Sequence, residues 1–471
     1  MGQEVKKKRR LKRSIKLKLY QSIILINVCW ILLLVGYYGY RLVYFYKMEH
    51  KSESETGMLV DNLILDKNIV VEGDGLYEDD GKYIYKGNVD NNYIYYDGLL
   101  WRIVSIDKQH NMKLITEENV TSLVYGNNGY LKSPIRNWLI PTKNVNHTGI
   151  FLNNLKEFNK YQVSGETCID VISNVKKTTC KKKEKEFSGL LSLSEYEEAR
   201  GKNSYLNNGL VFYTSSVNKD NEVYVISKDG EIITEKSGAT GFRAMITLKN
   251  NVKLVSGDGT ANLPYQVKDE KVDTLKDAYV GEYVTISNSK YRIISNDSNV
   301  IKLALEGVIK NDHEFDPESV EFNPENYDNI AYYLNNELIN SYKEKSKLIE
   351  STYYTGAYNE ENHYNYLKTY SDSVKSLIGF LQVGDYFLAN YNNVYTLTKA
   401  TVSKDADNYT DNTIITISSN RIYGDLPTSV KDIRPVISLK GDLKVSGSGT
   451  KDKPYEVIIK WKKGIKKQRY L

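Results

Sequence analysis

The chain of 471 residues is too long for one ordinary hydrophobic core, so we expect two or three domains. Its net charge of +5 is unevenly distributed, because residues 1–18 carry +8 and residues 460–471 carry +6, which leaves −9 for residues 19–459. A mildly acidic body does not suit a surface that follows the phosphates of a nucleic acid, so no nucleic-acid partner is expected.

The N-terminal segment has the composition of a membrane anchor. A basic head over residues 1–18 precedes residues 19–40, which contain no charged side chain, and the apolar run continues past Arg41 to Tyr46. These 22 uncharged residues, at about 1.5 Å each, are long enough to span a hydrocarbon core of about 30 Å. The positive-inside rule then predicts a single-pass protein of the cell membrane, with its span at 19–46, a cytoplasmic N-terminus and an extracellular bulk.

A cleaved signal peptide and a buried soluble helix are the alternatives to this anchor. A signal peptide has an apolar region of about 7–15 residues before a small-x-small cleavage site, whereas this run is longer and ends in bulky Tyr and Arg residues. A soluble helix of this length has no need of nine flanking cations. We therefore expect an uncleaved signal-anchor, followed by a polar stalk over residues 47–72.

Short strands open a first module, which is predicted over residues 73–267. Asp97-Gly98 predicts a two-residue hairpin turn, since this dipeptide readily adopts positive φ. Strands are expected at 83–87, 93–96, 99–106, 112–116, 211–214, 223–227, 231–234 and 242–248.

Three short helices are expected between these strands. Ser133 followed by Pro134 is typical of a helix start, and the helix to Leu139 would place Ile135 and Trp138 on one face. The other two are expected over 151–158 and over 190–199, the latter with Ser194 as its N-cap.

The landmarks of this module return in the same order about 190 residues later. Trp101-Arg102-Ile103-Val104-Ser105-Ile106-Asp107 recurs as Tyr291-Arg292-Ile293-Ile294-Ser295-Asn296-Asp297, and the closing strand at 242–248 recurs at 433–439. The sequence therefore predicts a tandem duplication, with a second module over 268–457 and a basic tail over 458–471. The tail mixes Trp and Ile with cations, which suits either an anionic envelope surface or a solvated disordered end.

Two pairs of arginines occupy equivalent places in the modules, Arg102 with Arg292 and Arg243 with Arg434. We interpret them, together with the aromatic residues Trp101 and Tyr291, as structural, because both copies keep them whatever their loops do. A ligand-binding role for the arginines is the alternative.

These motifs resemble an uncharacterised family of tandem surface modules from low-GC Gram-positive-type bacteria. The family shows a GDGLY lead-in, an NYI…LWRI strand pair, an S-x-IR-x-WL helix and an RPV-x-x-L strand before a G-x-G-T turn and PY. The corresponding residues here are 73–77, 92–94, 100–103, 133–139 and 434–439. The first module departs with Ala244 where the second has Pro435, and the second lacks the Trp of WRI. The resemblance implies location and architecture.

The closing Gly241-Phe242-Arg243 is more remotely similar to the end of formylglycine-generating-enzyme and C-type-lectin-like domains. This resemblance implies two α+β modules, each with a mixed, mainly antiparallel sheet and long loops.

Cys168 and Cys180 are the only cysteines outside the predicted span, which contains Cys29. In an oxidising exterior they favour a disulfide, worth about 2–3 kcal/mol in the chain-entropy model. Free thiols and a metal pair are the alternatives, although two thiolates without a nearby His supply only half a zinc site.

An acidic run in the second module is the remaining candidate for metal binding. Oxygen ligands at this spacing suit calcium, but no Gly stands at the EF-hand position and the first module has no such run, so a solvated loop is expected. The run comprises Asp312, Glu314, Asp316, Glu318 and Glu321.

None of the five His lies beside a nucleophile signature, and no HExxH, GxSxG or P-loop pattern occurs, so no enzyme, cofactor, catalytic residue or metal ligand is predicted. The sequence instead predicts extracellular modules for adhesion or ligand recognition, with a cell-envelope polymer or a host or cell-surface glycan or protein as partner. A divergent extracellular enzyme and an envelope-assembly scaffold are the alternatives. Function that differs between the modules is expected in the loops that do not repeat, at 168–180, 312–326 and 352–372.

Overall fold

The computed structural model describes Tyr20 and residues 24–41, 57–156, 158–175, 178–236, 238–267, 271–359, 365–401, 413–418 and 421–458. The predictions for the basic head, the residues between 42 and 56, and the tail beyond 458 lie outside these ranges. The chain divides into two units, one formed by Met1–Thr56 with Val255–Gly257 and the other by the rest of the chain, which we call the body.

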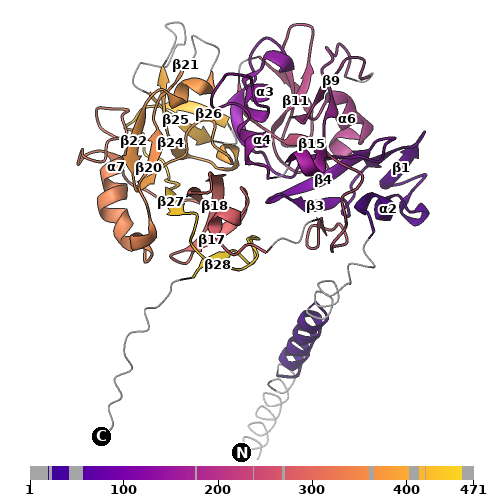
Figure 1. Ribbon diagram of the computed structural model, residues 1–471, viewed down its shortest axis with the longest axis horizontal. Helices are drawn as coiled ribbons and strands as arrows, with labels where there is room; N and C mark the ends of the chain where they lie inside the picture. Colours follow the sequence, from indigo (N-terminus) through magenta and orange to yellow (C-terminus); the bar gives the residue numbers. More distant parts are fainter. Residues whose placement is uncertain are drawn as a thin grey trace, which may run out of the picture. The chain divides into compact units, whose positions relative to one another are not determined.

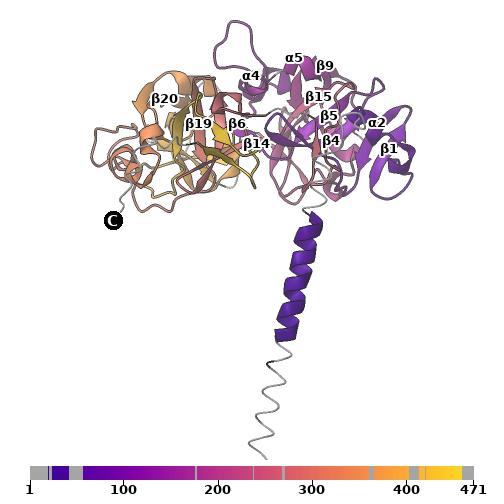
Figure 2. The ribbon, with the colours of Figure 1, turned by 60° about the horizontal axis from the view of Figure 1, so that its bottom comes forward.

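Ile24–Arg41 is the one helix in the described part of the chain that is long and apolar enough to cross a membrane. Its large side chains, among them Trp30 and Leu33, are exposed, since no protein surface covers them. A helix satisfies its backbone internally, so an apolar helix of this kind is compatible with a single-pass membrane anchor. Figure 2 shows it in deep violet.

The body consists mostly of β-strands, and Figure 1 shows its first half (residues 57–267) in violet and magenta beside its second half (residues 271–458) in orange and yellow. A nine-stranded sheet of the first half contains β1 (Gly75–Asp79), β2 (Lys82–Lys86), β3 (Tyr93–Tyr96), β4 (Leu99–Ile106), β5 (Met112–Thr116), β7 (Gln162–Val163), β10 (Ser188–Leu190), β15 (Ala244–Leu248) and β16 (Tyr265–Gln266). A seven-stranded sheet of the second half contains β17 (Tyr283–Ile286), β18 (Ser289–Asn296), β19 (Val300–Leu305), β23 (Ile378–Gly379), β27 (Val436–Lys440), β28 (Val445–Ser446) and β29 (Tyr455–Val457).

These two sheets share one strand order. Hydrogen bonding runs β16-β3-β4-β5-β15-β10 in the first half and β29-β17-β18-β19-β27-β23 in the second, and in both only the first pair is parallel. The register agrees too, since Tyr93 faces Arg102 and Tyr283 faces Arg292. Each sheet has a register shift in the same place, at Ile103/Ser105 and at Ile293/Ser295.

Four further sheets complete the body. One joins β6 (Thr121–Val124), β14 (Ala239–Phe242), β21 (Ala357–Asn359), β24 (Val394–Thr401), β25 (Thr413–Ser418) and β26 (Arg421–Asp425); the others are β11 (Phe212–Val217) with β12 (Val223–Ile226) and β13 (Ile232–Glu235), β8 (Gly165–Cys168) with β9 (Lys183–Glu186), and β20 (Ser351–Tyr354) with β22 (Ser373–Ser376).

The helices in the described part of the body are short. They are α2 (Leu59–Leu63), α3 (Pro134–Leu139), α4 (Ile150–Asn154), α5 (Phe158–Tyr161), α6 (Leu193–Glu198) and α7 (Ile330–Tyr332), which continues as a π-helical segment, Tyr333–Glu337. The 3-10 turns are Asp66–Asn68, Tyr130–Lys132, Gly201–Asn203, Leu275–Asp277, Leu338–Ser341, Lys345–Lys347, Tyr366–Tyr370 and Leu388–Asn390.

The first module's central strands and its first helix agree with the sequence predictions. β3, β4 and β5 have the predicted bounds, and the turn between β3 and β4 has φ of 53° at Asp97 and 79° at Gly98. Ser133 is the N-cap of α3, where its hydroxyl accepts the backbone N–H of Arg136 at 3.1 Å.

Three local predictions are wrong. The N-cap of α6 is Ser192, whose capping box with Glu195 satisfies the first-turn backbone, whereas Ser194 lies inside the helix. The strand expected over 242–248 is broken at Arg243, because the chain leaves one sheet after β14 and enters another at β15. The C-terminal part of the stalk expected at 47–72 belongs to the body, since α2 buries three apolar side chains there.

The two halves are joined by a continuous sheet, ordered β21-β24-β25-β26-β14-β6, in which β14 and β6 come from the first half. Thr240 pairs with Arg421 at the junction, and Arg421 also forms a 2.9 Å ion pair with Glu235. Nearby, the indole of Trp138 donates to the Gly384 carbonyl at 2.7 Å. These contacts make the halves parts of one unit with a shared core.

A buried carboxyl lies at another point of contact between the halves. Glu282 accepts hydrogen bonds from the hydroxyls of Tyr455 at 3.1 Å and of Tyr95, in the first half, at 3.4 Å. The backbone N–H of Tyr279 donates to it at 2.8 Å. Burial raises the pKa of Glu282 to about 7, against the opposing effect of these hydrogen bonds.

We predict that Glu282→Gln flattens the dependence of stability on pH. The unfolded carboxyl keeps a pKa of 4.5, so the folded state binds more protons between pH 4.5 and about 7, and the free energy of unfolding falls as pH rises through this window. The variant should remove a difference of up to about 3 kcal/mol between acid and alkaline solution, measured by urea unfolding. The exposed Glu337→Gln serves as control, and an unchanged pH profile in Glu282→Gln would contradict the assignment.

Candidate functional site

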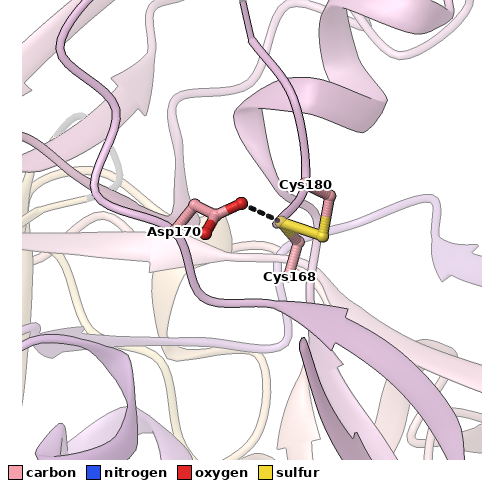
Figure 3. Close-up of side chains that lie close together, drawn as sticks. All are labelled: Cys168, Asp170 and Cys180. Atoms are coloured by element: carbon pink, nitrogen blue, oxygen red, sulfur yellow. Dashed lines mark hydrogen bonds between the residues drawn. A yellow bond between two sulfur atoms is a disulfide. The ribbon is translucent and has the colours of Figure 1, made fainter. Parts of the chain in front are cut away.

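A disulfide closes the hairpin of β8 and β9. The two strands pair from Gly165 opposite Glu186 to Cys168 opposite Lys183. Beyond them the chain forms a loop that the Cys168–Cys180 disulfide crosses, with a Cα–Cα distance of 5.7 Å and a sequence separation of 12 residues (Figure 3). The structure therefore brings together the two cysteines that the sequence paired as a disulfide candidate.

Asp170 holds the two sides of this loop together. Its carboxylate accepts the backbone N–H groups of Lys181 and of Lys182, the latter at 2.8 Å, and lies 3.5 Å from Cys168 Sγ (Figure 3). Cys168, Asp170 and Cys180 form the one group of potential metal ligands found among the described residues. Sulfurs joined to each other are not thiolates, so the oxidised group does not offer a zinc site.

The loop is fixed against β11 and β12. The Ser215 hydroxyl donates to the Cys168 carbonyl at 2.6 Å, and the Tyr224 hydroxyl donates to the Ile172 carbonyl at 2.8 Å. The backbone N–H of Ile172 donates to the Val217 carbonyl at 2.8 Å, and the Ile172 side chain is buried. The disulfide and these bonds tie Cys168 and Ile172 to the neighbouring strands.

Lysines cover the outside of this hairpin. Residues 169–185 contain six Lys and two acidic residues, a local charge of +4 in a body that is acidic as a whole. Lys181, Lys182, Lys183 and Lys185 are exposed. Lys183 forms a 2.6 Å ion pair with Glu166, and for the other three no ion pair is found within the described residues.

A small crevice, partly open to solvent, lies at the base of the hairpin, where β8, β9, β10 and β15 meet. The polar residues that line it include Thr167, Glu186, Ser188 and Thr247. Burial raises the pKa of Glu186, and the guanidinium of Arg136, 2.5 Å from the carboxylate, opposes this rise. Sequence reasoning missed this crevice, because Glu186 ends the charged run from Lys181 and resembles a solvated surface residue.

The acidic run of the second half does not converge on a cation site. Asp316 is buried, and its carboxylate accepts the backbone N–H of Ser319 at 2.8 Å and the amide of Asn329 at 2.7 Å. Hydrogen-bond donors thus surround the central carboxylate of this loop, and its role is to organise the turn.

The repeated arginines contact the chain's own rings and carbonyls. Arg102 stacks 3.8 Å from the ring centroid of Tyr93 and donates to the Val89 carbonyl at 2.6 Å. Arg292 stacks 3.7 Å from the ring centroid of Phe387 and donates to the Gly281 carbonyl at 3.1 Å.

The second pair of repeated arginines, Arg243 and Arg434, donates hydrogen bonds to carbonyls at the ends of strands. Arg243 donates to the Thr116 carbonyl at 2.6 Å, and Arg434 donates to the Leu305 carbonyl at 2.7 Å. Both guanidinium groups are buried, as are Trp101 and Tyr291 in the central strands. These contacts hold strands together within each half.

Comparison of the chain with protein families, curated proteins and solved structures gives no match.

We predict that replacing Cys168 and Cys180 with Ser lowers the free energy of unfolding by about 2–3 kcal/mol, because the unfolded chain regains loop entropy. Urea unfolding measures the loss, and Cys29→Ser is the control that leaves the disulfide intact. In the unreduced wild-type protein, alkylation under denaturing conditions should modify one cysteine, and after reduction it should modify three. Modification of three cysteines without reductant would contradict the disulfide.

Proposed function

We propose that the chain is a single-pass membrane protein whose β-rich body lies outside the cell and binds an anionic polymer of the cell envelope. The observation that carries this proposal is the disulfide-closed, lysine-covered hairpin of β8 and β9. Its exposed lysines follow one another closely in the chain, at residues 181–185, and clustered charge of one sign attracts a polymer of the opposite sign.

The apolar helix at the N-terminus supports the location, since the basic residues before it favour a cytoplasmic head. Disulfides form and persist in the oxidising environment outside the cell, which agrees with a body on that side of the membrane.

We further infer that the two halves descend from a tandem duplication. The shared strand order, register and bulge of their central sheets support this reading. The second half has an uncrosslinked hairpin, β20 with β22, at the place of β8 with β9. The binding function is accordingly assigned to the first half.

We expect the variant Lys181→Gln/Lys182→Gln/Lys185→Gln to bind polyphosphate roughly tenfold more weakly than wild type, since each lysine near an anionic surface contributes up to about 1 kcal/mol. The full chain in nanodiscs of neutral phosphatidylcholine is titrated with fluorescent polyphosphate at low and physiological salt. The matched control is Lys219→Gln/Lys228→Gln/Lys253→Gln, which removes three exposed lysines elsewhere. An equal loss in both variants would mean that net charge, and not the hairpin, decides binding.

The proposed orientation has its own test. A protease added to intact cells should remove an epitope placed after residue 471 and spare one placed before residue 1, because only the second lies in the cytoplasm. Permeabilised cells should lose both epitopes. Protection of the C-terminal epitope in intact cells would refute an extracellular body.

A further inference from the structure

The loop that the disulfide crosses brings a carboxylate next to the two sulfurs. Cys168, Asp170 and Cys180 each offer one ligand atom, and these three atoms lie within 4.8 Å of one another (Figure 3). In the oxidised protein the sulfurs are bonded to each other. In the reduced protein they are two thiols, and the loop then offers two sulfur ligands and one oxygen ligand. Sequence reasoning considered the two thiolates alone, since nothing in the sequence shows that Asp170 turns toward them.

The distances in this group suit a tetrahedral metal ion. Zinc binds thiolate sulfur at about 2.3 Å and carboxylate oxygen at about 2.0–2.2 Å, so a sulfur and an oxygen on one tetrahedral zinc lie about 3.6 Å apart. Asp170 Oδ2 lies 3.5 Å from Cys168 Sγ. Two sulfurs on one zinc lie about 3.8 Å apart, and the Cα–Cα distance of 5.7 Å between the cysteines allows this separation once the S–S bond is broken.

The backbone of the opposite side of the loop orients the Asp170 carboxylate. Its Oδ2 accepts the backbone N–H of Lys181, and its Oδ1 accepts the backbone N–H of Lys182 at 2.8 Å. Hydrogen bonds of this kind fix the direction of a ligating carboxylate. Because a carboxylate oxygen accepts more than one partner, Oδ2 keeps a position for a metal ion beside its N–H donor.

Backbone hydrogen bonds that do not need the disulfide hold the two sides of the loop together. The N–H of Ile169 donates to the Lys182 carbonyl at 2.9 Å, which continues the pairing of Cys168 with Lys183. The Ser215 hydroxyl donates to the Cys168 carbonyl at 2.6 Å. Opening the S–S bond therefore leaves the three ligands close to one another.

The charge around the loop favours a site that holds a divalent cation. Two thiolates and one carboxylate together carry −3, so a divalent ion leaves −1, which the exposed ammonium groups of Lys181 and Lys182 compensate. Asp170 and Cys180 are half-buried, whereas Cys168 is buried. Three protein ligands leave the fourth tetrahedral position to a water molecule.

We propose that the reduced hairpin binds one Zn²⁺ ion, or another divalent ion that prefers thiolates, through Cys168 Sγ, Asp170 Oδ2 and Cys180 Sγ, with water as the fourth ligand. An external dithiol supplies two electrons and two protons, so it becomes a disulfide while Cys168 and Cys180 become thiols. The metal ion then displaces the two thiol protons into water as the metal–sulfur bonds form.

Each chain is in this reduced state before its disulfide forms. The metal ion and the disulfide are therefore alternative crosslinks of the same loop, and each excludes the other. This site goes beyond the proposed polyanion binding and does not rest on it.

The test uses the full chain with Cys29→Ser in detergent micelles, reduced with a dithiol that is removed without oxygen, and titrated with Co²⁺. We expect one Co²⁺ per reduced chain, with thiolate-to-cobalt charge transfer and the visible absorption of tetrahedral cobalt, and displacement by Zn²⁺. The oxidised chain should show neither absorption. Zn²⁺ should also raise the urea midpoint of the reduced chain and not that of the oxidised chain.

Variants separate the three ligands from other metal-binding groups. Asp170→Asn should weaken Co²⁺ binding by roughly tenfold or more. Cys180→Ser, which keeps the Asp170 carboxylate, should abolish the tetrahedral spectrum. The matched control is Asp229→Asn, which removes an exposed carboxylate from the turn between β12 and β13 and should leave binding unchanged.

Absence of tetrahedral cobalt absorption in the reduced chain would overturn the proposal, and so would unchanged affinity in Asp170→Asn. One metal ion per two chains would mean that thiolates of different chains share it, which contradicts a site within one hairpin. Equally strong binding by the reduced chain in urea would show that the folded loop does not position the ligands. The polyanion test depends on lysine side chains and another probe, so failure of one proposal is distinguishable from failure of the other.

Discussion

The body depends on the backbone hydrogen bonding that passes from β14 of the first half to β26 of the second. An exposed strand edge is a liability, because its unpaired N–H and C=O groups invite pairing with other chains. Here each half covers an edge of the other, and six strands from both form one sheet. Trp138 reinforces the junction, since its indole donates to Gly384 and its ring packs 5.0 Å from Tyr386 between centroids. Two modules that resemble each other in sequence are therefore not independent in space.

The free-energy cost of burying a charge explains the contacts that surround the repeated arginines. A buried guanidinium is tolerated only when carbonyls, carboxylates or ring faces surround it. Arg243 and Arg434 each meet the carbonyl at the end of the strand that neighbours the closing strand, and Arg102 and Arg292 each lie over aromatic rings. Removal of any of these side chains would take the arginine donor away from at least one backbone carbonyl. The same constraint in both halves explains why these positions repeat while the loops do not.

The halves differ at the hairpin that follows the shared central strands. The first half has Gly165, Glu186 and a crosslinked basic hairpin there, whereas the second has serines that satisfy one another. The polyanion surface that we propose lies on the outside of this hairpin.

The sequence by itself determined the local elements whose signals are local. The apolar run, the Asp97-Gly98 turn and the central strands β3 to β5 could be predicted because hydrophobic pattern and turn chemistry act over a few residues. The cap of α6 was misplaced by two residues, since Ser192 and Ser194 both suit an N-cap and only the contact with Glu195 decides between them. Tertiary structure alone decided the sheet across both halves and the burial of Glu186. Both arise from pairing between strands far apart in the chain, which leaves no periodic pattern within any single segment.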